Sequence, residues 1–161
     1  MTAQRFSAPW STLLMFLTSL GSAVVFGAAY AASSEGNGVW SSVLVLIWLV
    51  CLAGHVRGYA IDGSRLRIER LLYSNTVDLS DLKEAEVHPN ALRRAIRLGN
   101  GGLFSFSGWY WNKTNGWMRV VATDVRSRCV LLKFDGSTWM VSPDDPRGFV
   151  ETVRRAAGID Q

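Results

Sequence analysis

The sequence WSTLLMFLTSLGSAVVFGAAYAASSEGNGVWSSVLVLIWLVCLAGHV, residues 10–56, decides the fold. It contains two apolar runs, 10–32 and 39–56, separated by a short polar segment that includes Glu35. Each run can supply the ~20 apolar residues that a helix needs to cross a bilayer. Neither run has an internal proline, so each helix can satisfy its own backbone hydrogen bonds in lipid. The sequence therefore predicts a transmembrane hairpin over residues 1–56 and one soluble domain over residues 57–161.

Basic residues orient this hairpin. Arg5 precedes the first run, several arginines follow the second, and the connecting segment 33–38 has no Lys or Arg. By the positive-inside rule both termini are expected in the cytoplasm, which predicts a multi-pass protein of the inner (cytoplasmic) membrane. An alternative stays open, because Ala29-Tyr30-Ala31 is a small-x-small sequence of the kind that signal peptidase cleaves. Cleavage there would leave a single anchor.

Small residues recur every four positions along the first predicted helix, at Ser19, Ala23, Gly27 and Ala31. This spacing places them in one ridge on one helix face. Such a ridge lets a second helix approach closely, and close packing drives helix association in lipid. The second span is the simplest partner for the ridge, and dimerisation of two chains is the alternative. Aromatic residues near the span ends are expected to be interfacial anchors: Trp10, Trp40 and Tyr59.

After the second run, apolar residues alternate with polar ones, as they do in strands. About seven strands are predicted, with hairpin turns at Asp62-Gly63 and Asp135-Gly136. Ser74-Asn75 is predicted to be another turn, and Gly99–Gly102 a flexible joint. The arm Met1–Ala8 is expected to be loose.

The chain ends in a predicted amphipathic helix. Asp145 followed by Pro146 is typical of a helix N-terminus, and Gly158 of a helix end. Phe149, Val150, Val153 and Ala157 mark its apolar face.

The composition gives little sign of catalysis. Two histidines and two cysteines lie far apart among 161 residues, so no metal motif or disulfide framework is expected. Asp144 and Asp145 are adjacent carboxylates, but they stand where a helix start favours negative charge. The net charge of +4 is modest, and it suits an anionic membrane surface better than nucleic acid. We expect no enzyme, no cofactor and no nucleic-acid partner.

Two surface segments are candidates for binding. Trp, Tyr and Arg dominate binding hot spots, and the candidate partner surface consists of Trp109, Tyr110, Trp111, Lys113, Trp117 and Arg119. The alternative is that these residues have a structural role, because strand alternation would bury about half of them in the domain. The segment Ala91–Leu98 is basic, and Arg93, Arg94 and Arg97 are candidate contacts for anionic lipid. A solvated connecting loop is the alternative there.

Several stretches carry a resemblance to a known family: Tyr59–Gly63, Leu79–Leu82, Gly102–Phe104, Val120–Thr123 and Val141–Pro146 followed by Phe149-Val150. Over roughly residues 57–157 the chain resembles the bacterial pleckstrin-homology-like (PH-like) domains that are attached to short transmembrane segments. The resemblance implies a PH-like barrel of about seven antiparallel strands capped by a C-terminal helix. Eukaryotic PH domains bind phosphoinositides through a basic first hairpin, and here that hairpin holds Arg65 and Arg67 without a lysine-rich loop.

These observations together predict a non-enzymatic, membrane-tethered interaction or scaffold module. Its expected partners are the lipid bilayer and other membrane or cytoplasmic proteins. Peripheral sensing of anionic lipid by the basic segment is the first alternative. Self-assembly into a homo-oligomer through the helix ridge is the second.

Overall fold

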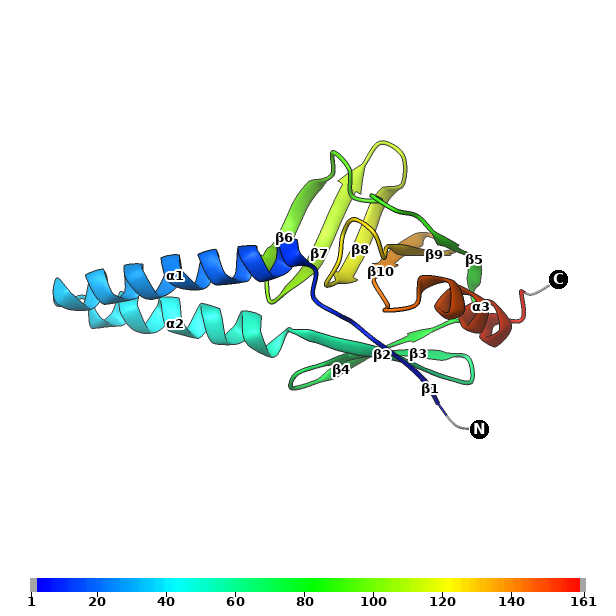
Figure 1. Ribbon diagram of the computed structural model, residues 1–161, viewed down its shortest axis with the longest axis horizontal. Coiled ribbons are helices and arrows are strands. Elements are labelled where there is room, and N and C mark those ends of the chain that lie inside the picture. Colours follow the sequence, from blue (N-terminus) through cyan, green and yellow to red (C-terminus); the bar gives the residue numbers. More distant parts are fainter. Residues whose placement is uncertain (1–2, 160–161) are drawn as a thin grey trace.

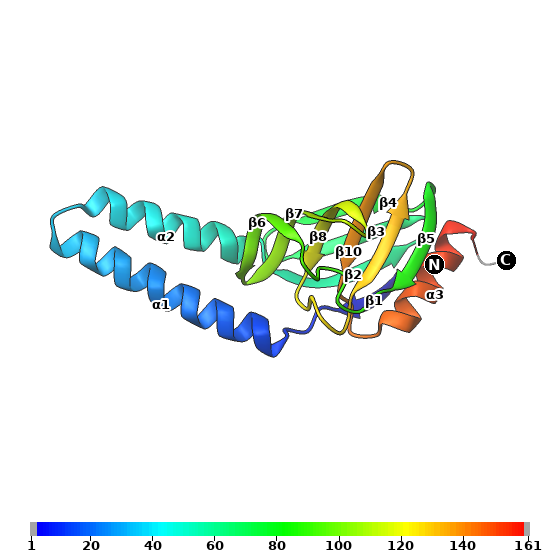
Figure 2. The same ribbon diagram turned by 90° about the horizontal axis from the view of Figure 1, so that it is seen from above.

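The computed structural model describes residues 3–159 and has two parts, a helical hairpin and a β-rich domain (Figure 1). Helices α1 (Thr12–Ser34) and α2 (Gly38–Ala53) lie side by side and project from one end of the domain (Figure 2). By length and composition α1 could cross a membrane, whereas α2 is a shorter apolar helix of 16 residues. The predicted spans are shifted at their ends. The second predicted span, 39–56, extends past the end of α2, because Val56 already belongs to a strand.

Within residues 3–159, ten strands form two separate sheets. The first sheet has the order β1-β2-β3-β4, and all its neighbours are antiparallel. Its strands are β1 (Gln4–Ser7), β2 (Val56–Asp62), β3 (Arg65–Arg70) and β4 (Ser74–Asp78). Strand β1 precedes the helical hairpin and its partner β2 follows it, so the two helices begin and end beside the same sheet.

The second sheet has the order β5-β9-β10-β8-β7-β6. Its strands are β5 (Leu82–Val87), β6 (Ile96–Leu103), β7 (Ser105–Asn112), β8 (Gly116–Ala122), β9 (Val130–Phe134) and β10 (Ser137–Val141). Strands β8 and β10 pair in parallel, because the β9–β10 hairpin inserts between β8 and β5. The β-rich domain followed by a C-terminal helix forms as predicted, but its two sheets do not close into the predicted barrel, and the pairing of β8 with β10 is not antiparallel.

The C-terminal helix α3 (Pro146–Ala157) packs on the main core, as predicted. The ring of its buried Phe149 lies edge-on to Phe6 of β1, with centroids 5.1 Å apart, and to Tyr59 of β2 at 5.8 Å. Asp145 caps the helix by accepting a hydrogen bond from the Gly148 N–H (3.1 Å). Gly158 ends it with a φ of 70°, which L side chains rarely adopt.

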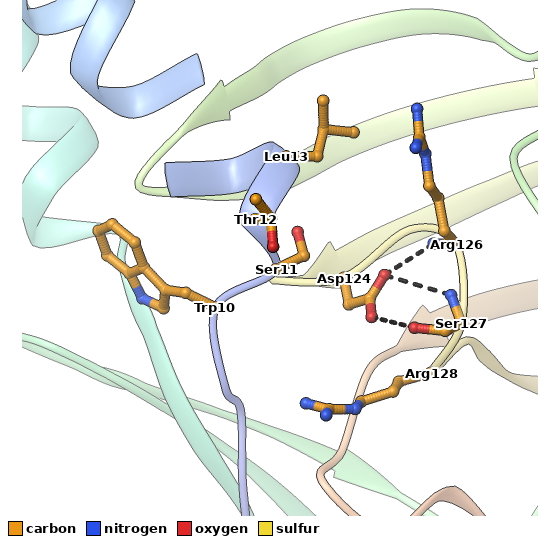
Figure 3. Close-up of a pocket in the computed structure, with 8 residues that line it drawn as sticks. All are labelled: Trp10, Ser11, Thr12, Leu13, Asp124, Arg126, Ser127 and Arg128. Carbon is orange, nitrogen blue, oxygen red and sulfur yellow. Dashed lines mark hydrogen bonds between the residues drawn. The ribbon is translucent and has the colours of Figure 1, made fainter. Parts of the chain in front are cut away.

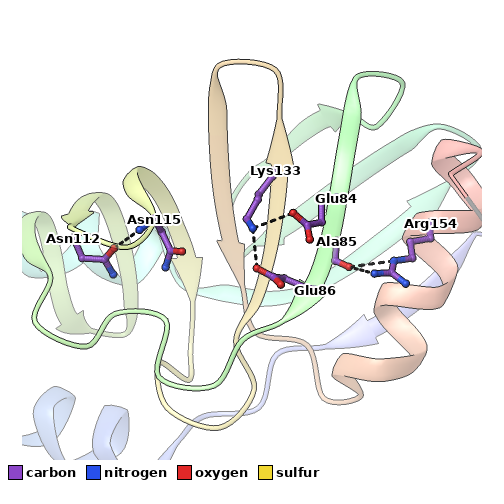
Figure 4. A network of polar contacts seen from close by, with 7 residues as sticks. All are labelled: Glu84, Ala85, Glu86, Asn112, Asn115, Lys133 and Arg154. Atoms are coloured by element: carbon purple, nitrogen blue, oxygen red, sulfur yellow. Dashed lines mark hydrogen bonds and ion pairs between the residues drawn. The ribbon is translucent and has the colours of Figure 1, made fainter.

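Helix α3 also protects one edge of the six-stranded sheet (Figure 4). Arg154 donates two hydrogen bonds to the carbonyl oxygen of Ala85 on the edge strand β5, at 3.1 and 2.8 Å. On the neighbouring strand β9, Lys133 forms ion pairs with Glu84 and Glu86 of β5, at 3.0 and 2.9 Å. Charged side chains along an edge discourage pairing with other chains.

The other edge strand, β6, lies where the helical hairpin joins the β-rich domain. The Thr18 hydroxyl of α1 donates to the Gly102 carbonyl (3.1 Å) and accepts from the Phe104 N–H (3.0 Å). Leu14, one turn earlier, is fully buried in a second core cluster. The first turns of α1 are therefore packed against protein.

Three local predictions are wrong. The arm Met1–Ala8 is not loose within its described part, because Gln4–Ser7 forms β1; residues 1 and 2 lie outside the described range. Ser74-Asn75 lies in β4, and the chain turns just before it, at Leu71–Tyr73. Gly99–Gly102 belongs to β6 rather than to a flexible joint.

The glycines of β6 are explained by a close approach of two strands. Gly99 pairs with Gly108 of β7, and both have positive φ, at 144° and 142°. A Cβ on Gly99 would lie 2.5 Å from the carbonyl oxygen of Ser107, so a side chain would force the strands apart.

Candidate functional site

Strands β6, β7 and β8 present an aromatic face, which we define as Ile96, Leu98, Trp109, Trp111, Trp117 and Arg119. Directly paired residues share a face of a sheet, and these residues pair as Leu98 with Trp109 with Arg119, and Ile96 with Trp111 with Trp117. The relative exposures are 60% for Ile96, 59% for Leu98, 49% for Trp109 and 53% for Trp117. The far ends of these strands extend beyond the four-stranded sheet (Figure 1). Large apolar groups thus remain exposed in one contiguous patch.

Arg119 stands between two tryptophans of this region. Its guanidinium carbon lies 4.8 Å from the ring centroid of Trp139 on β10 and 5.9 Å from that of Trp109. Both distances permit cation–π attraction. Arg119 is therefore held over the sheet while its charge stays exposed.

The predicted partner surface is assembled in part. Trp109, Trp111, Trp117 and Arg119 share the aromatic face. Tyr110 does not, because alternation turns it to the opposite face, where it is fully buried and donates a hydrogen bond to the Asn100 carbonyl (3.0 Å).

Sequence reasoning missed Ile96 and Leu98 as members of this surface. The alternation of apolar and basic residues in Ile96-Arg97-Leu98 is a strand signal that could have found them. Trp139 was missed as well, since its contact with Arg119 depends on the parallel pairing of β10 with β8.

A basic pocket of about 460 Å³ lies beside the aromatic face, at the β7–β8 turn. It is lined by Arg93, Arg94 and Lys113 together with Trp111 and neighbouring polar residues, and no carboxylate is among its lining residues. Arg97 does not line it, because Arg97 pairs with Tyr110 and so takes the opposite face of β6. Two of the three predicted lipid contacts are thus brought together with Lys113.

The ridge of small residues does not pack against α2. Ser19, Ala23, Gly27 and Ala31 are all exposed, and a Cβ on Gly27 would meet no atom within 4 Å. Other residues make the contact between the helices: Trp48 donates to the Ser22 hydroxyl (2.9 Å) and lies against Phe26. The prediction that the second span covers the ridge is wrong, while association between chains stays a prediction.

A cavity of about 340 Å³ opens where α1 begins, beside the loop 124–128 (Figure 3). Its acidic residue, Asp124, is occupied within the loop: its carboxylate accepts from the Arg126 N–H (2.8 Å) and from the Ser127 hydroxyl (2.5 Å). Burial would raise the pKa of Asp124, but these hydrogen bonds and the charge of Arg128 bring it below the ordinary value. A carboxylate held ionised in this way stabilises a loop rather than transferring protons.

Metal-binding groups are not gathered in this structure. Among residues 3–159, no cluster of three or more His, Cys, Asp or Glu side chains could hold a metal ion. Cys51 and Cys129 are free and lie in α2 and next to β9.

Residues 57–157 match the family model described as Bacterial PH domain. The chain belongs to the bacterial PH domain family. No curated protein and no solved structure gives a significant match. The PH domain match covers β2 to α3, so β1 and the helical hairpin lie before it.

PH domains are generally non-catalytic, and membership in the family suggests a binding or scaffold module. The basic first hairpin of this PH domain is β2–β3, which contains Arg65 and Arg67. Its turn lies at the end of the domain that is distant from α1 and α2 (Figure 1). The aromatic face and the basic pocket lie elsewhere, on β6, β7 and β8 and the segment before β6.

Proposed function

We propose that this chain is a non-enzymatic binding or scaffold module, held at the cytoplasmic face of the inner membrane by α1 and α2, with the aromatic face as its protein-binding surface. The observation that carries the proposal is the exposure of Ile96, Leu98, Trp109 and Trp117 on one sheet face. A contiguous apolar patch of this kind typically marks an interaction site.

The exposed helical hairpin supports the membrane tether. Its apolar side chains are largely uncovered, including Phe16, Val24, Tyr30 and Ile47. A surface of this composition would be costly in water and is favoured in lipid. Confinement at a membrane raises the effective concentration of the PH domain for neighbouring membrane proteins.

Strand pairing supports the predicted topology. Because β1 and β2 are hydrogen-bonded neighbours, the segments before α1 and after α2 must lie on the same side of any bilayer. An even number of crossings meets this condition, and the basic residues that follow α2 favour the cytoplasmic side.

The same contacts argue against a cleaved signal. Removal of the chain up to Ala31 would delete β1, buried Leu14 and the Thr18 hydrogen bonds to the β6–β7 turn. The PH domain would then lose part of both core clusters.

The test uses the full chain in its native membrane with a photo-crosslinking phenylalanine analogue at Trp117. The matched control places the same group at Lys83, which is exposed on β5. We expect a discrete protein adduct from position 117 that is lost when Trp109→Ala is added, and none from position 83. Identical adducts from both positions, or none from 117, would contradict the binding role. Extraction by alkaline carbonate tests the tether separately, and release of the chain into the aqueous fraction would contradict it.

A second candidate is recognition of anionic lipid by the basic pocket, favoured by the three cations and the lack of lining carboxylates. Each basic residue near an anionic surface adds about 1 kcal/mol. In nanodiscs that contain a photoactivatable anionic lipid, Arg93→Gln with Arg94→Gln should reduce labelling about tenfold or more. Arg65→Gln with Lys83→Gln, at exposed residues of β3 and β5, is the control. Equal labelling of both double variants would remove this candidate.

A further inference from the structure

The β3–β4 turn, Leu71-Leu72-Tyr73, carries three large apolar side chains that are widely exposed. Their relative exposures are 40%, 77% and 51%. The turn itself is well ordered by hydrogen bonding, because the Arg70 N–H donates to the Tyr73 carbonyl (2.9 Å). Three large apolar side chains gathered in one exposed turn are typical of a surface that another molecule or lipid covers.

This turn is fixed beside the end of α2. The Leu71 N–H donates to the His55 carbonyl (3.0 Å), and Arg70 donates to the Gly54 carbonyl (2.6 Å). A shallow cleft of about 300 Å³ lies between Tyr73 and the last turn of α2, and Val50 and Cys51 line it. The β3–β4 turn therefore lies at the end of the domain from which the hairpin projects (Figure 1).

The length of the helical hairpin determines how closely a bilayer must approach this end. The 16 residues of α2 span about 24 Å. In α1, Leu14 and Thr18 pack against the domain, and the segment Ser19–Ser34 beyond them is also about 24 Å long. The hydrocarbon core of a bilayer is about 30 Å thick. A hairpin shorter than the core draws the adjoining protein surface into the interface or thins the bilayer.

The charges beside the turn complement a lipid surface. A cleft of about 320 Å³ next to Leu71 and Leu72 is lined by Arg57, Arg67 and Arg70. Its acidic residue, Glu69, lies 3.9 Å from the Arg5 guanidinium and is thereby partly neutralised. Apolar side chains flanked by arginines are the composition that inserts at the boundary of headgroups and acyl chains.

We infer that the Leu71-Leu72-Tyr73 turn enters the headgroup region of the bilayer that holds the hairpin, with Arg57 and Arg67 at lipid phosphates. This second contact fixes the tilt of the PH domain against the membrane. It also leaves the β2–β3 turn directed toward the cytoplasm. The inference rests on the proposed membrane tether and goes beyond it by assigning the surface that meets the lipid.

The experiment uses the full chain with Cys51→Ala and Cys129→Ala, reconstituted in vesicles of neutral and anionic phospholipid. A single cysteine carrying an environment-sensitive fluorophore is placed at Leu72, at Ser64 in the β2–β3 turn, or at Ile47 on the exposed side of α2. Lipids with a spin label at a shallow or a deep acyl position quench fluorophores at the corresponding depth. Aqueous iodide quenches fluorophores that remain in water.

We expect shallow spin labels to quench position 72 at least threefold more than position 64, and deep labels to quench position 47. Quenching at 47 without quenching at 72 would overturn the inference and leave the tether intact. Absence of quenching at 47 would overturn the tether and the inference with it. Protection of position 72 from iodide without quenching by lipid would show that protein covers the turn, which also overturns the inference.

A second variant tests whether the fluorophore at position 72 itself carries the turn into lipid. Leu71→Ser with Leu72→Ser, labelled at Tyr73, should lose most of the shallow quenching that the Tyr73 label shows with both leucines present. Unchanged quenching would mean that the leucines do not hold the turn in lipid.

Discussion

The guanidinium of Arg70 donates a hydrogen bond from Nη1 to the carbonyl oxygen of Gly54, over 2.6 Å. Gly54 is the C-cap of α2, where unpaired carbonyls carry the negative end of the helix dipole. Arg70 also donates from Nε to the side chain of Asn75 on β4 (3.2 Å). One side chain thus joins the end of the hairpin to two strands of the domain.

Replacement of Arg70 should loosen this junction. Arg70→Met removes charge-assisted hydrogen bonds in a half-buried setting and should lower the free energy of unfolding by about 1–3 kcal/mol. Hydrogen exchange at the amides of His55 and Leu71 should accelerate as well. Arg67→Met is the matched control, because Arg67 is exposed on the same strand. Similar effects of the two variants would contradict the assigned role of Arg70.

The Tyr59 hydroxyl joins the two sheets. It donates to the Val121 carbonyl (2.8 Å) and accepts from the Ser142 N–H (3.1 Å), while the ring is fully buried. Tyr59→Phe leaves both backbone groups without this partner and should cost about 1–3 kcal/mol in thermal or chemical denaturation. Tyr73→Phe, at an exposed tyrosine, should change stability by less than about 0.5 kcal/mol.

The same residue predicts an alkaline transition. Burial raises the pKa of Tyr59 to about 12, although hydrogen bonds from Ser142 oppose the shift. Tyrosine in the unfolded chain titrates near pH ~10. The folded state holds the proton more tightly, so this stabilisation is complete below pH ~10 and is lost as the pH rises toward the folded value. Melting temperatures measured across that interval should fall more steeply for the native chain than for Tyr59→Phe.

Asp124 predicts the opposite dependence, at acidic pH. Its carboxyl has a pKa below the ordinary value, since hydrogen bonds and Arg128 outweigh burial. The stabilisation is present above the unfolded value, near ~3.9, and is lost as the pH falls through the folded one. Asp124→Asn should cost about 1–2 kcal/mol at neutral pH and flatten the acid limb of the stability curve. Asp135→Asn, in an exposed turn, is the control and should change stability at neutral pH by less than about 0.5 kcal/mol.

The exposed ridge on α1 predicts association of two chains. A Cβ on Gly27 would meet no atom of the monomer within 4 Å, so an effect of Gly27→Leu is expected to report on contacts between copies. If the ridge mediates close packing in lipid, this variant should reduce the dimer fraction severalfold by energy transfer between labelled chains. Val50→Leu, exposed on α2, is the control. A dimer fraction unchanged by Gly27→Leu would exclude the ridge as an interface.

Local signals in the sequence predicted local structure well. The turn at Asp62-Gly63, the cap at Asp145 and the helix end at Gly158 depend on a few adjacent residues, and all three form as expected. The family resemblance over residues 57–157 is confirmed.

Features that depend on distant partners could not be predicted. The glycines of Gly99–Gly102 indicate a flexible segment when only the sequence is considered. They form part of a strand because Gly108 of β7 lies opposite Gly99. Tyr59 was expected to be an interfacial anchor, yet it is buried because Val121 and Ser142 satisfy its hydroxyl. The aromatic face needed the register of three strands, which alternation within each strand cannot supply.

The pairing of Arg5 with Ala60 has a consequence for biosynthesis. Strand β1 leaves the ribosome first, but its partner β2 is made only after both helices. The nascent chain must therefore complete the hairpin before its first sheet can close. Under the proposed membrane tether, a chain in which only one helix had entered the bilayer would keep β1 and β2 on opposite sides of it, and the first sheet could not form.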